Sequence, residues 1–301
     1  MTEPFTTYGA PHTPAPTPVT PPTNGLNFEA LRDHALLRTM APITLDEMRG
    51  VKLMNRVDTK YVLSEEEVFA MLQCAANEGF RVQVIDGKCA ARYDTLYYDT
   101  ADRAMYIAHH NRQLTRQKVR TRYYAESAVT YLEIKNKSNR GRTSKHRVEI
   151  EASEQYNFSN NTAAVAFFES SARYALTELS PALATHFTRI TLVNHELTER
   201  ITIDLDLRYE DVRSGCSAAV RGMAIVEVKQ EGTATSAIKR ILSSLRIQPL
   251  KISKYCLGTS LTVEGIKRNR MQQKLRSIEK RIGYNRVIIN NINRINRYHN
   301  D

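Results

Sequence analysis

Charged and apolar residues alternate with a period of two along residues 117–152. Three segments of this stretch each place charged side chains on one face and mainly apolar side chains on the other. Their charged faces hold Lys118, Arg120 and Arg122, then Glu133, Lys135 and Lys137, and finally Lys145, Arg147 and Glu149. Because side chains alternate between the two sides of a strand, the pattern predicts three strands. The short links between them predict an antiparallel meander.

The same alternation returns in two segments farther along the chain, residues 199–209 and 224–230. Their polar faces hold Arg200, Thr202, Asp204, Asp206, Arg208, Glu227 and Lys229. A solvated face of an antiparallel sheet is the simpler explanation. Five strands with mostly basic charge instead favour a closed barrel whose charged lumen holds a polyanion. The apolar outer face of such a barrel must be covered by helices.

Weaker patterns complete the predicted element order. Strands are predicted at 51–64, 92–100, 186–196 and 250–261, with a short strand or hairpin at 106–114. Helices are predicted at 26–41, from Ser64 to Gly79, at 162–180 with Pro181 closing it, and at 235–247. The second helix opens with a capping box between Ser64 and Glu67. The result is an α+β protein with about eight or more strands.

Composition divides the chain into three parts. Residues 1–25 hold seven of the ten prolines and predict a disordered Pro/Thr-rich leader. Residues 26–263 form the predicted globular domain. Residues 264–301 hold ten Lys/Arg and three acidic residues, so this tail carries +7 of the net charge of +11. The tail is predicted to be partly helical, solvated and outside the barrel, where it could contact polyphosphate, acidic lipid or RNA.

Several function classes lack their signatures. The four cysteines show no metal-finger spacing, and GxxxxGK[ST], GxSxG and HExxH are absent. The sequence also has no apolar run long enough for a transmembrane helix and no secretory signal, which favours a cytoplasmic protein, peripheral to a membrane at most. What remains is a set of fixed cations with a few carboxylates. Such a set suits phosphoryl transfer, which depends on positioning and charge stabilisation.

Nine short motifs together resemble one family. VDTKY, YYDT, KVRTRYY, YLEIKNK, KHR, FTRITL, RITID, VEVK and ISKYCLG follow one another between Arg49 and Leu261. This order is similar to that of the polyphosphate polymerase domain of vacuolar transporter chaperone (VTC) complexes, in the triphosphate tunnel metalloenzyme superfamily. The resemblance implies an antiparallel eight-stranded β-barrel, the triphosphate tunnel, with helices packed outside. It also implies transfer of the γ-phosphoryl group of ATP to polyphosphate, with Mn²⁺ or Mg²⁺ as cofactor.

The resemblance also implies roles for individual residues. The phosphate-binding cations would be Lys60, Arg120, Arg122, Lys135, Lys145, Arg189, Arg200 and Lys254. Substrate would also contact Ser253 and Tyr255, with Arg147 and Lys229 as weaker candidates. Glu227 matches the metal-binding glutamate. Glu133 is a second metal candidate, for which an internal salt bridge is the alternative. For Tyr97, Tyr98 and Tyr255, core packing is an equal alternative to substrate contact.

Two alternatives to a polymerase remain open. One is a triphosphatase of the same fold, although RVDTKY has one acid where the hydrolase and cyclase branch has two in its ExExK signature. The other is a non-catalytic binder of polyphosphate or nucleic acid, which the absence of Trp and the strict alternation disfavour. A polymerase is expected to have a basic tunnel open at both ends. Coupling to a membrane would require a separate protein partner or the tail.

Overall fold

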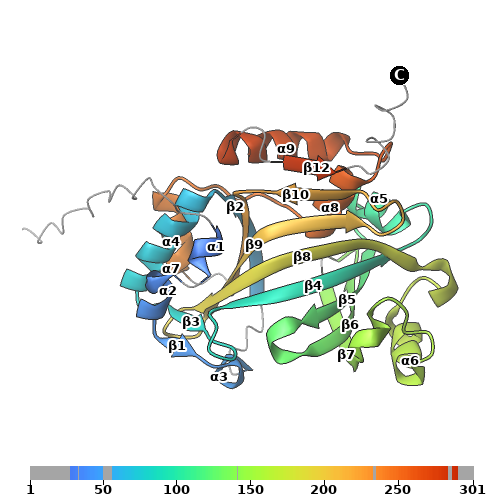
Figure 1. Cartoon of the computed structure of the whole chain (residues 1–301), viewed down its shortest axis with the longest axis horizontal. Helices are drawn as coiled ribbons and strands as arrows, with labels where there is room; N and C mark the ends of the chain where they lie inside the picture. Colours follow the sequence, from blue (N-terminus) through green and yellow to red (C-terminus); the bar gives the residue numbers. More distant parts are fainter. Residues whose placement is uncertain are drawn as a thin grey trace, which may run out of the picture.

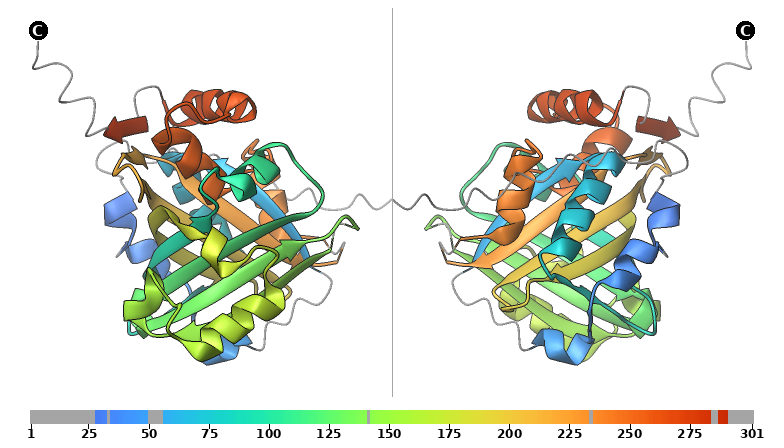
Figure 2. Two further views of the ribbon diagram at one scale, coloured as in Figure 1. Left: turned by 90° about the vertical axis from the view of Figure 1, so that its right-hand side faces the viewer. Right: turned by 90° about the vertical axis from the view of Figure 1, so that its left-hand side faces the viewer.

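The computed structural model describes residues 28–32, 34–49, 56–140, 142–232, 235–283 and 287–290. All of its strands belong to a single sheet, in which eight antiparallel neighbours follow the order β7-β6-β5-β4-β8-β9-β11-β2. These strands are β2 (Arg56–Leu63), β4 (Ala90–Asp99), β5 (Arg116–Tyr124), β6 (Val129–Lys137), β7 (Thr143–Ile150), β8 (Ser180–Val193), β9 (Glu199–Asp211) and β11 (Ala224–Glu231). The sheet curls around a concave face (Figure 2). The predicted α+β fold and the antiparallel meander are confirmed, although among the described residues no pairing joins β7 to β2.

Four short strands extend the sheet. β1 (Pro42–Ile43) runs parallel to β3 (Arg81–Gln83), which pairs with β8. β10 (Ser217–Val220) pairs with the second half of β9, and β12 (Val287–Asn290) pairs with β10. The first half of β9 pairs with β11 instead. β9 therefore belongs to the curled sheet at one end and to a flanking ribbon at the other (Figure 1).

The change of partner in β9 coincides with a bulge. Asp206 has a left-handed φ of 53°, and the register between β8 and β9 shifts between His186 and Thr188. As a result, Tyr209 shares the concave face with Asp204, while Asp206 turns outward and forms an ion pair with Arg32. The prediction that one face of 199–209 is polar throughout is therefore wrong beyond Asp204, because a bulge re-aims the side chains that follow it.

Helices cover the convex face in two groups (Figure 1). α1 (Phe28–Leu31), α2 (Ala35–Thr39), α4 (Glu65–Asn77) and α7 (Ala237–Ser244) pack on the outer side of β2, β8, β9 and β11. α6 (Thr162–Ser171) covers β4 to β7. α3 (Leu45–Arg49) and the 3-10 turns η1 (Ala125–Ser127), η2 (Ala152–Gln155) and η3 (Leu176–Glu178) lie in connections. The predicted capping box of Ser64 and Glu67 is present in α4.

Residues 106–114 form no strand or hairpin. They overlap α5 (Ala104–His110). Asp99 is fully buried and accepts hydrogen bonds from the backbone N–H groups of Met105 and Tyr106, at 2.9 Å each. A carboxylate that satisfies these orphan donors, and that lies at the positive end of the helix, stabilises a helix start.

The predicted final strand at 250–261 is also wrong, because α8 (Lys254–Thr262) occupies it. Ser253 caps this helix by accepting a hydrogen bond from the N–H of Cys256. The helix packs against the concave face of the sheet, and a Cβ on Gly258 would lie only 2.7 Å from Leu183 Cδ2. α8 therefore closes one end of the lumen, and the expectation of a tunnel open at both ends is wrong.

The helix predicted at 162–180 is shorter than expected. α6 ends at Ser171. Pro181 is the second residue of the long strand β8 and does not close α6. The ladder between β4 and β8 is irregular at this point, between Tyr97 and Tyr98. A proline is tolerated at such a position because it interrupts no regular hydrogen bond there.

The tail contains α9 (Asn269–Ile282), so its predicted helix is confirmed. Only its outer face is solvated, since Met271, Ile278 and Ile282 are buried in the cluster that also holds Leu257 of α8. The leader 1–25 and the end of the tail, residues 291–301, lie outside the described residues. None of the described helices is long and apolar enough to cross a membrane.

Candidate functional site

The predicted charged strand faces meet on the concave side of the sheet. Cross-strand registers place Lys60 opposite Glu227, Arg120 opposite Glu133, and Lys118 opposite Lys135. The charged lumen is defined here by Lys60, Lys118, Arg120, Arg122, Glu133, Lys135, Lys145, Arg189, Arg200, Asp204, Glu227, Lys229 and Lys254. Toward α8 the same face becomes apolar and carries Tyr97, Leu183, Phe187 and Tyr209. The lumen is therefore charged at its open part and apolar where α8 fills it.

Glu227 on β11 lies between two lysines. Its Oε2 is 2.7 Å from Lys60 Nζ, and its Oε1 is 3.2 Å from Lys229 Nζ. Burial alone would raise the pKa of Glu227, but Lys229 and Lys60 hold it well below its usual range. The carboxylate is therefore ionised at neutral pH and keeps two ammonium groups at the lumen wall.

Glu133 on β6 holds a second pair of cations. Its side chain is 1% exposed, Oε2 is 2.6 Å from Arg120 Nε, and Oε1 forms an ion pair with Lys145. Burial would raise the pKa of Glu133, but Arg120, Arg122 and Lys145 hold it well below its usual range. The internal salt bridge that the sequence left open for this residue is present.

Asp204 on β9 is the third lumen carboxylate, and the sequence analysis did not assign it to the site. It is fully buried and binds Arg189 in a bidentate pair, with Nε to Oδ1 at 2.5 Å and Nη2 to Oδ2 at 2.9 Å. Lys254 at the start of α8 forms an ion pair with Oδ2. The alternation of residues 199–209 placed Asp204 on the charged face, but its partners lie on β8 and α8, too far apart in sequence for a local pattern to reveal.

Three lumen cations, Lys118, Arg122 and Lys135, form no ion pair with a carboxylate among the described residues. Lys118 Nζ donates to Ser253 Oγ at 2.8 Å, and Arg122 Nε donates to Thr95 Oγ1 at 2.9 Å. Lys135 is exposed and forms no ion pair within the described part of the chain. Burial lowers the pKa of Lys118 to about 8. Carboxylates act on Arg122 and Lys135 only over a longer distance, so neither side chain is held in an ion pair that an anionic ligand would have to break.

Two predicted substrate contacts differ in their surroundings. Tyr255 is 1% exposed, stacks on Tyr97 at 4.9 Å between ring centroids, and its hydroxyl is hydrogen-bonded to Asp99. Packing, the alternative that the sequence left open, accounts for these contacts. Arg147 lies on the edge strand β7 opposite Glu133, on the same face as Lys145, with its guanidinium 4.3 Å from the centre of the Tyr131 ring.

The donor set can be tested for a divalent metal. No group of three or more His, Cys, Asp or Glu side chains suitable for a metal occurs among the described residues. A divalent ion that bridges phosphates needs only one or two carboxylates. Glu227 fits this role better than Glu133, because its side chain is 15% rather than 1% exposed. Lys60 or Lys229 would move from one of its oxygens to phosphate.

A separate cavity of about 270 Å³ lies outside the lumen. It is lined by Arg32, His34 and Cys89 among others, and by no residue of the charged lumen. The charge that could bind a polyanion is therefore in the lumen rather than in this cavity.

Comparisons with known proteins place the chain in a family. Two solved structures that resemble the chain are putative adenylate cyclases. The one from Vibrio parahaemolyticus is 11% identical with a TM-score of 0.40, over 67% of this chain and 96% of that one. The one from Hippeastrum, described as having a dominant triphosphatase activity, is 14% identical with a TM-score of 0.44, over 70% and 98%. No curated protein matches. The sequence model of the VTC domain matches residues 55–263, more than half of the chain, and the protein therefore belongs to the VTC domain family.

Proposed function

We propose that this protein is a metal-dependent polyphosphate polymerase, which transfers the γ-phosphoryl group of ATP to a growing polyphosphate chain. The observation that carries the proposal is the convergence of lumen cations from seven strands and one helix onto one concave face. Buried phosphate charge requires such matched cations and donors. Membership of the VTC domain family supports the same class of chemistry.

The lumen residues can divide the work of binding. Arg120 and Arg122 present planar guanidinium groups that match phosphate oxygens, and they would grip the donor phosphates. Lys60 and Lys254 would hold the acceptor or product end. Mn²⁺ or Mg²⁺ at Glu227 would neutralise charge that develops on the bridged phosphates. Little covalent chemistry is asked of the protein, because alignment and charge stabilisation supply most of the catalysis.

A polymerase must favour phosphate over water as the acceptor. The apolar, α8-filled end of the lumen restricts water behind the charged part, and no second acid accompanies Asp58 in RVDTKY to orient an attacking water. A triphosphatase remains the second candidate, favoured by the same cations and by the activity described for the Hippeastrum protein.

Incubation of the purified protein with ATP and Mn²⁺, followed by sizing of acid-labile phosphate polymers, tests the proposal. We expect ADP and chains with little free phosphate, and we expect Glu227→Gln to suppress both products even at high metal concentration. Glu210→Gln, on the exposed outer side of β9, is the matched control and should retain activity. Orthophosphate without chains would establish the triphosphatase, and salt-sensitive polyphosphate binding without either product would establish a non-catalytic binder.

A further inference from the structure

Asp204 occupies the boundary between the charged and the apolar parts of the lumen. It contacts Arg189 from β8 and Lys254 from α8, so one carboxylate joins two consecutive strands to a helix that begins 50 residues farther along the chain. Phe187 lies beside the same group, with Lys254 Nζ 4.4 Å and the Arg189 guanidinium 5.3 Å from its ring centre. The carboxylate, the two cations and the ring form one packed unit at the inner end of the charged lumen.

A negative charge here is unexpected in a site for polyanions. Asp204 is fully buried and would repel any phosphate placed beside it. Its two oxygens are nevertheless fully used, since Arg189 binds both of them and Lys254 binds one. A carboxylate in this position fixes the orientation of both cationic side chains. In metal sites, a carboxylate that accepts a hydrogen bond from a metal-binding histidine fixes the orientation of that histidine in the same way.

We infer that Asp204 is a positioning residue, which holds the Arg189 guanidinium and the Lys254 ammonium in the geometry that binds phosphate. The inference rests on the proposed function, because it assigns Asp204 a role in the same phosphate-binding lumen. It concerns how the cations are held and adds no group that touches the substrate.

The role has a consequence for charge as well as for position. Burial lowers the pKa of Lys254, Asp204 opposes this change, and Arg189 and Lys60 add to it. The net result is a pKa of about 8. The groups that face this ammonium are Asp204 on β9, Arg189 on β8, Lys60 on β2 and the Tyr97 phenol on β4, with Lys118 of β5 beside it at Ser253. Without Asp204, burial and the neighbouring cations act unopposed, and Lys254 loses its proton at a lower pH.

Asp204→Asn tests this in two ways. We expect the ratio of wild-type to variant turnover to be about fivefold greater at pH 8.0 than at pH 6.0, because a fall of one unit from a pKa of about 8 leaves roughly one tenth rather than one half of Lys254 protonated at pH 8.0 and changes little at pH 6.0. Calorimetric binding of inorganic tripolyphosphate at pH 7.5, in two buffers of different ionisation enthalpy, should show about half a proton more taken up than by the wild type, because Lys254 is roughly three-quarters protonated in the free wild type and roughly one-quarter protonated in the free variant. A purely structural role would lower activity equally at both pH values and leave proton uptake unchanged, and that result would overturn the inference.

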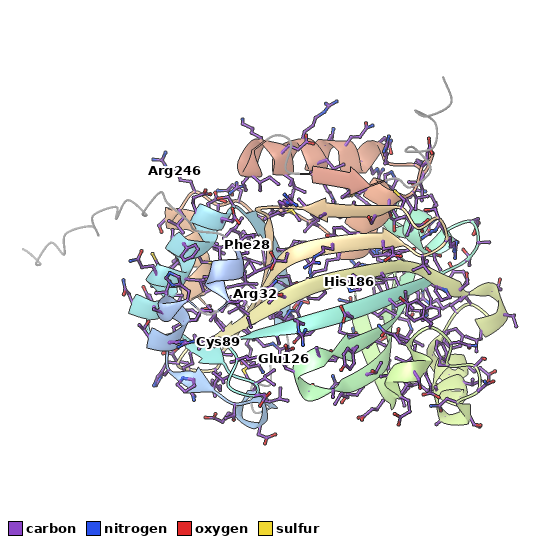
Figure 3. All side chains as sticks on the ribbon, in the orientation of Figure 1. Phe28, Arg32, Cys89, Glu126, His186 and Arg246 are labelled. Carbon is purple, nitrogen blue, oxygen red and sulfur yellow. The ribbon has the colours of Figure 1, made fainter. Side chains whose placement is uncertain are left out.

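Asp94→Asn is the matched control. Asp94 pairs with His186 on the outer face of the same sheet, and this variant should behave as the wild type in both measurements (Figure 3). Should Asp204→Asn fail to fold, Asp204→Glu keeps the charge and displaces it by one methylene. That variant should keep wild-type proton uptake but lose turnover at every pH, and full turnover would overturn the positioning role. If the wild type turns over no ATP, the proposed function fails, while the tripolyphosphate measurement still tests Asp204.

Discussion

Arg120 and Arg122 look equivalent in the sequence, but the structure gives them different partners. Arg120 forms an ion pair with Glu133, which is 1% exposed, and donates a 3.3 Å hydrogen bond to the Tyr97 hydroxyl. Arg122 is 6% exposed and its guanidinium lies 5.7 and 5.8 Å from the centres of the Tyr93 and Phe187 rings, and no carboxylate pairs with it among the described residues. We therefore expect Arg120→Ala and Arg122→Leu to change the stability of the ligand-free protein in opposite directions.

The magnitude follows from Glu133. Breaking a fully buried ion pair costs about 3–5 kcal/mol. Lys145 still neutralises part of the Glu133 charge after Arg120→Ala, and water can enter the lumen, so about 2 kcal/mol is expected here. For a domain of this size that corresponds to a fall in Tm of about 4–8 °C. Arg122→Leu removes a buried charge without a carboxylate partner, so its Tm should stay level or rise.

The pH dependence adds a second criterion. The folded pKa of Glu133 lies well below its ordinary value of 4.5, so its stabilisation is present above about pH 4.5 and is lost as the pH falls toward the folded pKa. The deficit of Arg120→Ala, which acts through Glu133, should therefore be largest near pH 7 and smaller near pH 3. Arg122→Leu should show less of this change, because Arg122 contributes to the Glu133 pKa only over a longer distance.

Thermal unfolding of both variants at pH 7.5 and pH 3.5 measures these differences, and tripolyphosphate binding measures their shared effect. Each variant should lose about 2–4 kcal/mol of binding free energy, because each removes a cation from the donor phosphates. Glu133→Gln completes a double-mutant cycle with Arg120→Ala and isolates their coupling. Equal Tm values for the two arginine variants, or a higher Tm for Arg120→Ala, would refute the assignment of Glu133 as the partner that stabilises the lumen.

Three further predictions concern the closed end and the buried lysines. Truncation after Gly265 should lower the free energy of unfolding by about 5 kcal/mol, because α9 buries three apolar side chains against the domain, and an unchanged Tm would contradict this packing. Gly258→Ala should lower the free energy of unfolding, measured with denaturant, by about 1–3 kcal/mol, because the added methyl group overlaps side chains of β8 and β9. An unchanged free energy would show that α8 can shift away from the sheet. Lys118 and Lys254 have folded pKa values of about 8, below the ordinary 10.5, so the stability of the ligand-free protein should rise between about pH 8 and 10.5 while tripolyphosphate affinity falls over that range.

The strands of the lumen were predictable because alternation survives wherever one face is charged and the other packs on helices. The registers of β5, β6 and β7 agree with the alternation in residues 117–152. The same rule failed after Asp204, because a bulge changes which residues share a face, and its marks, the positive φ of Asp206 and the register shift against β8, are visible only in the structure. The sequence also identified the cations of the lumen but not their partners. Asp204 contacts Arg189 on the neighbouring strand and Lys254 on a separate helix, and a local pattern shows neither contact.

The two missed helices have a common physical cause. α8 is buried on all sides from Tyr255 to Thr262, so no polar face alternates with an apolar one, and its tyrosine, leucine and threonine content resembles a strand. Ser253 as N-cap was the one local signal available. α5 is only seven residues long, and its start is stabilised by Asp99, a residue that the sequence analysis placed in the preceding strand, 92–100. Tertiary contacts outweighed local propensity in both segments.

The position of α8 also constrains how the proposed polymerase can operate. A phosphate chain cannot pass axially between α8 and the sheet, because a single methyl group at Gly258 would already overlap Leu183. Donor and product must then share the remaining open side of the lumen, where Lys135 is exposed and the Lys145 side chain is 36% exposed. A lysine that forms no ion pair among the described residues suits this region, since the flexible point charge of Lys135 can follow a moving phosphate chain, whereas the guanidinium groups of Arg120 and Arg189 are held by buried carboxylates deeper inside. Lys145 lies between these two cases, because it is partly exposed but pairs with the same Glu133 that holds Arg120. In the proposed polymerase, the fixed cations would align the phosphates for transfer, and Lys135 would contact the part of the polymer that moves.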